Sequence, residues 1–365
     1  MKLKKHLFKI FFILSIFSFS NLKLEKKSTD DQKQSDEPVE ITVDHSKEIV
    51  VGQSRYKSKA FELYGDIIET GIVACFNSIN EQGGINGKKL RLISMDDKGE
   101  PLIAEKNIDF MRTKYKIDMF LGNMGTRSII KVLPLIQNGE IAMFFPWAGD
   151  ERLRNPNLTN IINVPGLIEP QIELLVDHTI NNLGFRKIGI FHADDAFSVA
   201  NANDAISFLK KYGISPIAVE SYNRFTMNIQ RTAKKLLKAD PKVIICLSTT
   251  PPTVKLISTF FEHGDFGTTF LGIDSTFFVG DILKEKGAKF FYSSAVPDPK
   301  DATIPIVKEY QENLTKFFPK EIFNILSLTY YISAKIIVLA MKNIVGPITK
   351  EKIIAQIEQM QNYDI

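Results

Sequence analysis

The sequence has 365 residues, and 44% of them are hydrophobic, which is enough for one large or two medium cores. Its formal charge of +4 comes from the N-terminus: the first 20 residues hold four of the 46 basic side chains and no acidic one, so the remainder carries 42 of each sign. This balance excludes a general attraction to nucleic acid or to anionic lipid, and no nucleic-acid partner is expected.

The N-terminus predicts export. Three lysines within the first five residues precede a short apolar run at 10–19, and Ser18 and Ser20 are small residues at the positions that a signal peptidase reads. Residues 1–20 are therefore predicted to be a cleaved signal peptide, with an uncleaved membrane anchor as the alternative. Residues 21–46 are polar and poor in aromatic residues, which predicts a disordered linker. The protein is expected to be periplasmic or otherwise exported.

From residue 48 onward, short runs rich in β-branched residues alternate with longer helical patterns, which predicts parallel sheets covered by helices on both faces. The predicted strands are 48–53, 90–96, 119–122, 142–145, 187–191, 217–221, 243–247, 269–271 and 290–295. The predicted helices are 60–81, 101–114, 128–138, 170–183, 200–212, 229–239, 251–263, 303–318, 325–344 and 350–361.

A break near 161–170 separates four complete β/α units from a fresh series, so the sequence predicts an α/β fold of two doubly wound, Rossmann-like lobes. In such sheets ligands bind beyond the carboxyl ends of the strands, at helix N-termini. Cys75 and Cys246 each lie in an apolar run, which favours buried free thiols over a disulfide.

Motifs for catalysis are sparse. The glycine-rich stretch 83–89 lacks the glycine and the hydroxyl that a phosphate loop needs, and the histidines show no metal spacing. No cofactor, metal or catalytic residue is therefore predicted, and the chain is not expected to be an enzyme. Two acidic pairs, Asp96-Asp97 and Asp194-Asp195, follow predicted strands; they could serve a hydrolase or cap helices and link the lobes by salt bridges.

Two strand ends carry features of a ligand site. In the segment 122–128, small residues precede a predicted helix, and Thr126 offers a hydroxyl that suits a carboxylate or, alternatively, an ordinary N-cap. After the next strand comes Trp147, the single tryptophan, which predicts an apolar wall for a ligand or, alternatively, core packing.

These segments resemble the type I periplasmic solute-binding proteins, in particular the branched-chain amino-acid-binding receptors of ABC transporters. The resemblance covers 48 to about 344, and its most specific part is the run FNSINEQGGINGKKL at 76–90. The other matching segments keep their order along the chain and are 51–54, 96–97, 122–126, 153–156 and 194–197. The resemblance implies a lobe formed by 47–165 plus about 294–345, hinged to a second formed by 166–293 plus the C-terminal segment.

The resemblance also implies the ligand contacts. Thr126 matches the residue that binds an α-carboxylate, the Trp147 carbonyl and the Asp274 carboxylate match groups that face an ammonium, and Phe197 matches an aromatic that closes over the ligand. Gly149 stands where the family has a threonine, which removes one hydroxyl. The predicted site is completed by pocket-lining and rim residues and by the neighbours of these contacts at strand ends: Tyr64, Thr249, Thr250, Ser54, Gly125 and Ala148.

The expected function is an extracytoplasmic receptor that clamps a small ligand, an amino acid or related small carboxylate, and hands it to the membrane permease of an ABC transporter. The protein is expected to act as a monomer. A ligand-sensing module for a signalling receptor and an exported hydrolase are the alternatives.

Overall fold

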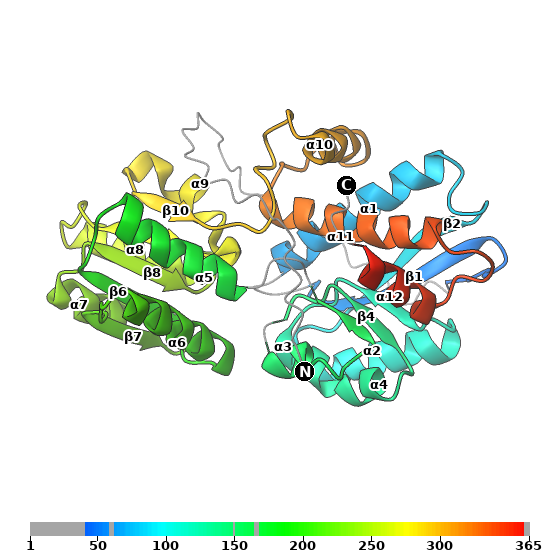
Figure 1. The fold of residues 1–365 in the computed structure, drawn as a ribbon, viewed down its shortest axis with the longest axis horizontal. Coiled ribbons are helices and arrows are strands. Elements are labelled where there is room, and N and C mark those ends of the chain that lie inside the picture. Colours follow the sequence, from blue (N-terminus) through cyan, green and yellow to red (C-terminus); the bar gives the residue numbers. More distant parts are fainter. Residues whose placement is uncertain (1–40, 58–61, 149, 164–167, 361–365) are drawn as a thin grey trace, which may run out of the picture.

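The computed structural model describes residues 41–57, 62–148, 150–163 and 168–360. It has two α/β lobes that lie side by side, each built on a five-stranded parallel sheet (Figure 1). This confirms the predicted fold class. The predicted signal peptide at 1–20 lies outside the described residues.

The sheet of the first lobe has the strand order β2-β1-β3-β4-β5. Its strands are β1 (Glu48–Arg55), β2 (Lys89–Asp96), β3 (Met119–Leu121), β4 (Ala142–Phe144) and β5 (Ile161–Ile162). Successive residues of β1 point to opposite faces, so Val51 packs under α1 (Glu62–Glu81) and α11 (Ile325–Lys342), whereas Val50 packs with α2 (Pro101–Lys114). The second face also carries the short helices α3 (Thr126–Lys131) and α4 (Leu133–Gln137), into which the predicted helix 128–138 divides.

The sheet of the second lobe has the strand order β10-β9-β8-β6-β7. Its strands are β6 (Ile188–Ala193), β7 (Ala218–Tyr222), β8 (Val243–Leu247), β9 (Thr269–Gly272) and β10 (Phe290–Tyr292). One face is covered by α5 (Ile168–Asp177), which continues as a π-helical turn (His178–Asn182), and by α6 (Ala196–Lys211). The other face is covered by α7 (Ile229–Ala239), α8 (Thr250–Glu262) and α9 (Val279–Leu283). Short 3-10 turns lie at Glu151–Arg154, Asp274–Thr276 and Lys284–Lys286.

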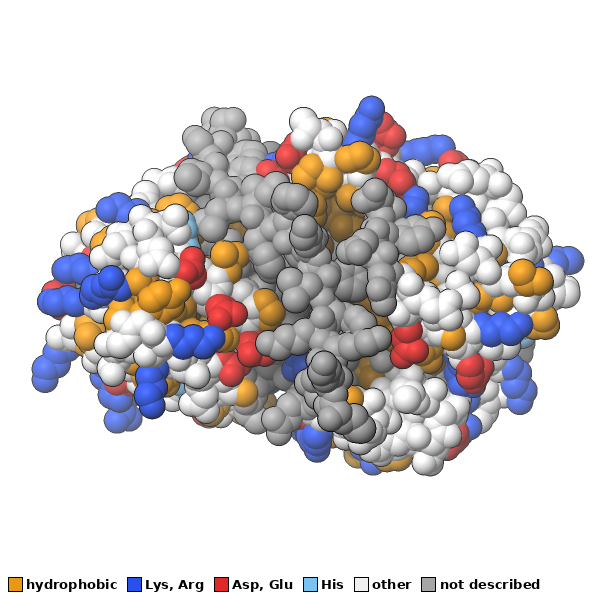
Figure 2. Space-filling view, viewed as in Figure 1, with side chains coloured by type: hydrophobic (Ala, Val, Ile, Leu, Met, Phe, Trp, Pro, Cys, Tyr) orange, Lys and Arg blue, Asp and Glu red, His pale blue; other side chains and the backbone are white. Residues whose placement is uncertain are grey.

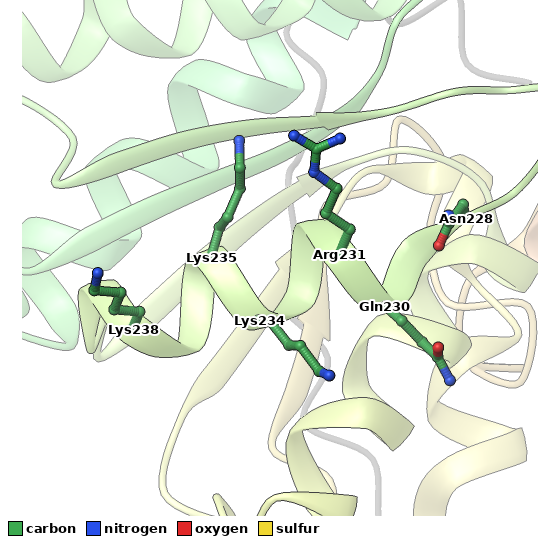
Figure 3. A pocket seen from close by; sticks show the side chains of 6 residues that line it. All are labelled: Asn228, Gln230, Arg231, Lys234, Lys235 and Lys238. Atoms are coloured by element: carbon green, nitrogen blue, oxygen red, sulfur yellow. The ribbon is translucent and has the colours of Figure 1, made fainter.

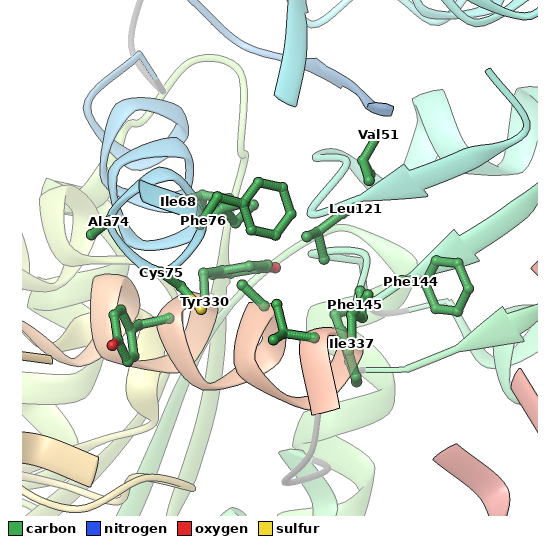
Figure 4. Packing of buried hydrophobic residues seen from close by; sticks show 14 of the residues in the cluster. Val51, Ile68, Ala74, Cys75, Phe76, Leu121, Phe144, Phe145, Tyr330 and Ile337 are labelled. Atoms are coloured by element: carbon green, nitrogen blue, oxygen red, sulfur yellow. The ribbon is translucent and has the colours of Figure 1, made fainter. Parts of the chain in front are cut away.

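Helices α1 and α11 form the centre of the first lobe's core (Figure 4). They approach closely because Gly71 of α1 lies against the backbone of Ser327, and a Cβ on Gly71 would overlap the Ser327 carbonyl oxygen. Among the described helices, α11 alone is long and apolar enough to cross a membrane, but 67% of it is buried within the lobe. Its apolar character is therefore explained by core packing.

The outer face of α7 is strongly basic. Its apolar side packs under the second sheet through Ile229, Ala233 and Leu236. Lysines and an arginine occupy the other sides (Figure 3), and Figure 2 shows basic side chains gathered at the left edge, over this lobe. Lys235 pairs with Glu220 at 2.7 Å. The shallow hollow on this face is an ordinary solvated helix surface.

Two chain segments differ from the prediction. Residues 41–46, predicted to belong to a disordered linker, lie against the first lobe: Ile41 and Val43 contact its core, and His45 Nε2 lies 2.8 Å from the carbonyl oxygen of Tyr115. The C-terminal segment, assigned to the second lobe, instead forms α12 (Lys350–Gln359), which packs on α11 in the first lobe together with α10 (Pro305–Phe317). Apolar side chains of α12 decide this placement, since Ile353 is fully buried in the first lobe's core.

Both cysteines are buried and unpaired, as predicted. Burial raises the pKa of the Cys75 thiol to about 12 and that of Cys246 further still. Neither thiol is a nucleophile at neutral pH.

Candidate functional site

A cavity of about 70 Å³ lies where the two lobes meet. The first lobe contributes Trp147 and Ala148, the second contributes Asp274, and the start of α11 closes one side. The complete lining is Pro146, Trp147, Ala148, Arg154, Asn163, Ile168, Asp274, Ser275, Phe277, Ile325, Leu326, Thr329 and Tyr330. Strand ends from two separate sheets therefore face one shared space.

An aromatic wall bounds this cavity. The ring of Trp147 stacks on Tyr64 of α1 with centroids 5.3 Å apart and an interplanar angle of 22°. Phe277 meets the other side of Tyr64 edge-on at 6.3 Å. Burial raises the pKa of the Tyr64 hydroxyl, and the polar groups of Thr250, at the start of α8, oppose that shift. The wall therefore joins the first lobe to the second, and Tyr64, predicted at the rim, is buried within it.

Backbone hydrogen bonds join the loops after β3 and β4 beside the aromatic wall. The Trp147 N–H donates to the Asn123 carbonyl at 2.8 Å, and the Gly125 N–H donates to the Trp147 carbonyl at 3.2 Å. Gly125 has φ of 100°, which favours glycine, and a Cβ there would come within 2.6 Å of the Tyr56 hydroxyl. The Trp147 carbonyl, predicted to face an ammonium, thus already accepts one hydrogen bond within the first lobe.

Asp274 supplies negative charge to the cavity. The buried Gln171 of α5 holds it twice: Gln171 Nε2 donates to Asp274 Oδ2 at 3.0 Å, and the Asp274 N–H donates to Gln171 Oε1 at 3.1 Å. Burial raises the pKa of the Asp274 carboxyl, while the bonds from Gln171 and from the Ser275 N–H oppose that shift. A buried carboxylate gains most when a positively charged guest pairs with it.

The structure unites part of the predicted site. Trp147, Ala148 and Asp274 line the cavity, and Tyr64 and Thr250 support its wall. Gly149 and the Phe197 side chain lie outside the described residues.

Four other predicted residues are not among the cavity lining. Ser54 is buried and donates to Asp97 Oδ2 at 2.9 Å. Thr126 opens the six-residue helix α3, Gly125 precedes it, and Thr249 caps α8. The contacts of these four residues with a ligand stay predictions.

Several lining residues escaped the sequence reasoning. Arg154 and Asn163 lie on the first lobe beyond β4, and Thr329 and Tyr330 lie on α11. The buried helix α11 follows the second lobe in the chain but returns to the first. Its N-terminal turns face the cavity because the chain crosses back after β10. An apolar helix far from any strand end gives no sequence signal for such a role.

The acidic pairs serve structure. Asp97 accepts from Ser54 and from the Gly99 N–H, and Asp96 accepts from the N–H groups of Lys57 and Lys98. In the second lobe, Asp195 caps α6 by accepting from the Ser198 N–H, and Asp194 accepts from Asn223. No group of three His, Cys, Asp or Glu side chains suited to a metal occurs among the described residues.

The chain matches the family model described as periplasmic binding protein over residues 48–365. It belongs to the periplasmic binding protein family. The curated relatives of this periplasmic binding protein include an amino acid binding protein of Pseudomonas aeruginosa, 21% identical over 60% of this chain, and a Leu/Ile/Val-binding protein homolog of Brucella melitensis, 24% identical over 50%. The chain spans 58% and 49% of the length of these two proteins. These relatives are binding proteins rather than enzymes.

Solved structures share the two-lobed fold of this periplasmic binding protein. A possible leucine/isoleucine/valine-binding protein from Rhodopirellula baltica superposes with a TM-score of 0.77 at 23% identity, covering 88% of both chains. A branched chain amino acid ABC transporter protein from Thermus thermophilus with bound valine gives 0.74 at 16% identity, covering 85% of this chain and 83% of that one.

Proposed function

We propose that this periplasmic binding protein captures a small amino-acid-like solute between its lobes and delivers it to the membrane permease of an ABC importer. The observation that carries the proposal is the shared cavity, in which Asp274 of the second lobe faces Trp147 of the first. Names of several relatives describe proteins that bind amino acids, which supports the same solute class.

The charges of the cavity suit a zwitterion. Asp274 offers a carboxylate for an ammonium group, and Arg154 adds a positive charge to the same lining for a carboxylate. Closure over the guest excludes water, and charge-assisted hydrogen bonds strengthen in the drier environment. Thr126 and Gly125, at the end of the loop after β3, stay predicted contacts of the ligand carboxylate.

The two lobes supply the signal for transport. Tyr64 of the first lobe lies near Thr250 of the second, so the lobes already touch beside the cavity. A ligand that contacts both lobes binds the closed arrangement more tightly than the open one and therefore favours closure. A permease that recognises both lobes together then distinguishes loaded from empty receptor. The predicted signal peptide would place the protein outside the cytoplasm, where such a receptor works.

Calorimetric titration of the full chain with the twenty amino acids and a set of small carboxylates tests the binding step. Trp147 provides a second readout, because it is the single tryptophan and lines the cavity. A bound solute should change its emission, with affinity about micromolar. Asp274→Asn should weaken binding of an amine-bearing solute. Asp240→Asn is its matched control, since Asp240 is an exposed acid paired with Lys187 and Lys242 at the far end of α7. No heat and no emission change with any solute would refute the proposal.

The transport step has its own test. Cells that carry the gene should take up the solute identified by titration, and deletion of the gene should abolish that uptake at low solute concentration. Normal uptake in the deletion strain, combined with binding in vitro, would favour the sensing role over the importer role.

A further inference from the structure

The cavity lining contains one buried hydroxyl without a partner. Tyr330, on the second turn of α11, is fully buried, and its hydroxyl has no hydrogen bond among the described residues. The residue lines the cavity, and the charge of Asp274 acts on its hydroxyl. Figure 4 shows Tyr330 projecting from α11 in the first lobe.

Other buried tyrosines nearby do not share this feature. The Tyr331 hydroxyl donates to Glu309 Oε1 at 2.7 Å and accepts from Asn313 Nδ2 at 2.7 Å. The Tyr310 hydroxyl pairs with the Ser327 hydroxyl. A buried hydroxyl left unpaired is costly, and phenylalanine would fill the same volume without that cost. A tyrosine at 330 therefore calls for a partner that enters the cavity.

We propose that the Tyr330 hydroxyl binds a polar group on the side chain of the solute, so that this protein prefers short hydrogen-bonding amino acids to branched apolar ones. The inference rests on the proposed function and names the solute class more narrowly. A pocket built to hydrogen-bond a hydroxyl or amide discriminates strongly against an analogue that lacks it, because the pocket's own polar group is then left unpaired.

Large rings crowd the cavity, which favours a short side chain. Trp147, stacked on Tyr64, occupies the adjoining space with a large ring, and Phe277 closes the other side. A short side chain with a hydroxyl or amide matches both this crowding and the chemistry of Tyr330.

Near-isosteric pairs of amino acids test the inference. Threonine and valine differ by a hydroxyl in place of a methyl group, and serine and alanine differ by one hydroxyl. We expect the wild-type protein to bind threonine or serine at least about tenfold more tightly than its apolar counterpart. Tyr330→Phe should reduce that preference to about twofold or less.

Tyr331→Phe is the matched control, because it removes a neighbouring tyrosine hydroxyl that is already bonded. It should lower the thermal midpoint and leave the preference unchanged. Tyr330→Phe should leave the midpoint of the unliganded protein unchanged or raise it, since no bond is lost in that state.

The outcomes separate the two proposals. Valine or alanine binding as tightly as its polar partner, with sensitivity to Asp274→Asn, would overturn the role of Tyr330 and leave amino-acid capture standing. A polar preference that persists in Tyr330→Phe would likewise overturn it. If none of the four amino acids binds and the wider panel gives no heat or emission change, capture fails and the inference falls with it.

Discussion

Replacing Asp274 by asparagine separates charge from shape in the cavity. The amide keeps the size of the carboxyl group, and the bond from the Asp274 N–H to Gln171 Oε1 is a backbone bond that survives. An ammonium about 4 Å from the carboxylate is worth about 4 kcal/mol at an effective dielectric of about 20, before the cost of desolvating it. A charged hydrogen bond contributes about 1.5–3 kcal/mol net.

We therefore expect Asp274→Asn to weaken an amine-bearing solute by about 2–3 kcal/mol at pH 7, or about 30- to 150-fold. The same change should raise the thermal midpoint of the unliganded protein, because burial disfavours the ionised carboxylate. Calorimetry and thermal unfolding measure the two effects. The 2-hydroxy analogue of the solute, which lacks the amine, should lose little affinity.

Two results would refute this reasoning. Equal losses for the amine and its 2-hydroxy analogue would show that Asp274 shapes the cavity without pairing with an ammonium. An unchanged affinity for the amine would place the ammonium elsewhere.

Three further predictions follow from the geometry. Burial raises the pKa of the Asp274 carboxyl above its ordinary 3.8, so affinity for a cationic solute should fall as the pH drops through that raised pKa. Just above the raised pKa, binding of the cation should release a proton. The stability of the unliganded protein should change in the opposite direction and increase as the pH falls from the raised pKa toward 3.8. An affinity that begins to fall only below pH 3.8 would contradict this. Gly71→Ala should destabilise the protein by about 3 kcal/mol in urea, because its Cβ meets the Ser327 backbone, whereas Gly280→Ala in α9, with open space around it, should stabilise by about 0.5–1 kcal/mol. Equal effects at the two positions would show that α1 and α11 do not pack as described. Tyr64→Phe removes a hydroxyl whose pKa responds to Thr250 of the second lobe, and it should weaken solute binding about three- to tenfold through the closed state, while the stacking on Trp147 persists. Unchanged affinity in calorimetry would show that this hydroxyl does not stabilise closure.

Hydrophobic runs predicted the inner strands well because β3, β4, β6, β8 and β9 are buried on both faces. The strand 243–247 and the helices 101–114 and 229–239 match the structure residue for residue. The two-residue strand β5 escaped because Ile161 and Ile162 are too few to form a pattern. Residues 41–46 were misjudged because polar composition hides Ile41 and Val43, which contact the core.

The site was harder to predict than the fold. Trp147 lies close to the end of β4 and was singled out there, whereas Asp274 was expected from the family resemblance, and their contacts with a ligand stay predictions. Tyr330 could not be found that way: it belongs to a helix whose hydrophobic pattern predicts core packing, and only the three-dimensional path of the chain brings it to the cavity. Whether a buried hydroxyl is satisfied is a property of its neighbours in space.

The side chain of Gln171 contacts both Asp274, the carboxylate of the cavity, and a segment by which the chain passes between the lobes. It stands on α5, near where the chain enters the second lobe, and its Oε1 accepts from Ser293 Oγ at 3.5 Å, where the chain leaves β10 to return. The same amide holds Asp274. One amide of the second lobe therefore joins Asp274 to the points where the chain enters and leaves that lobe.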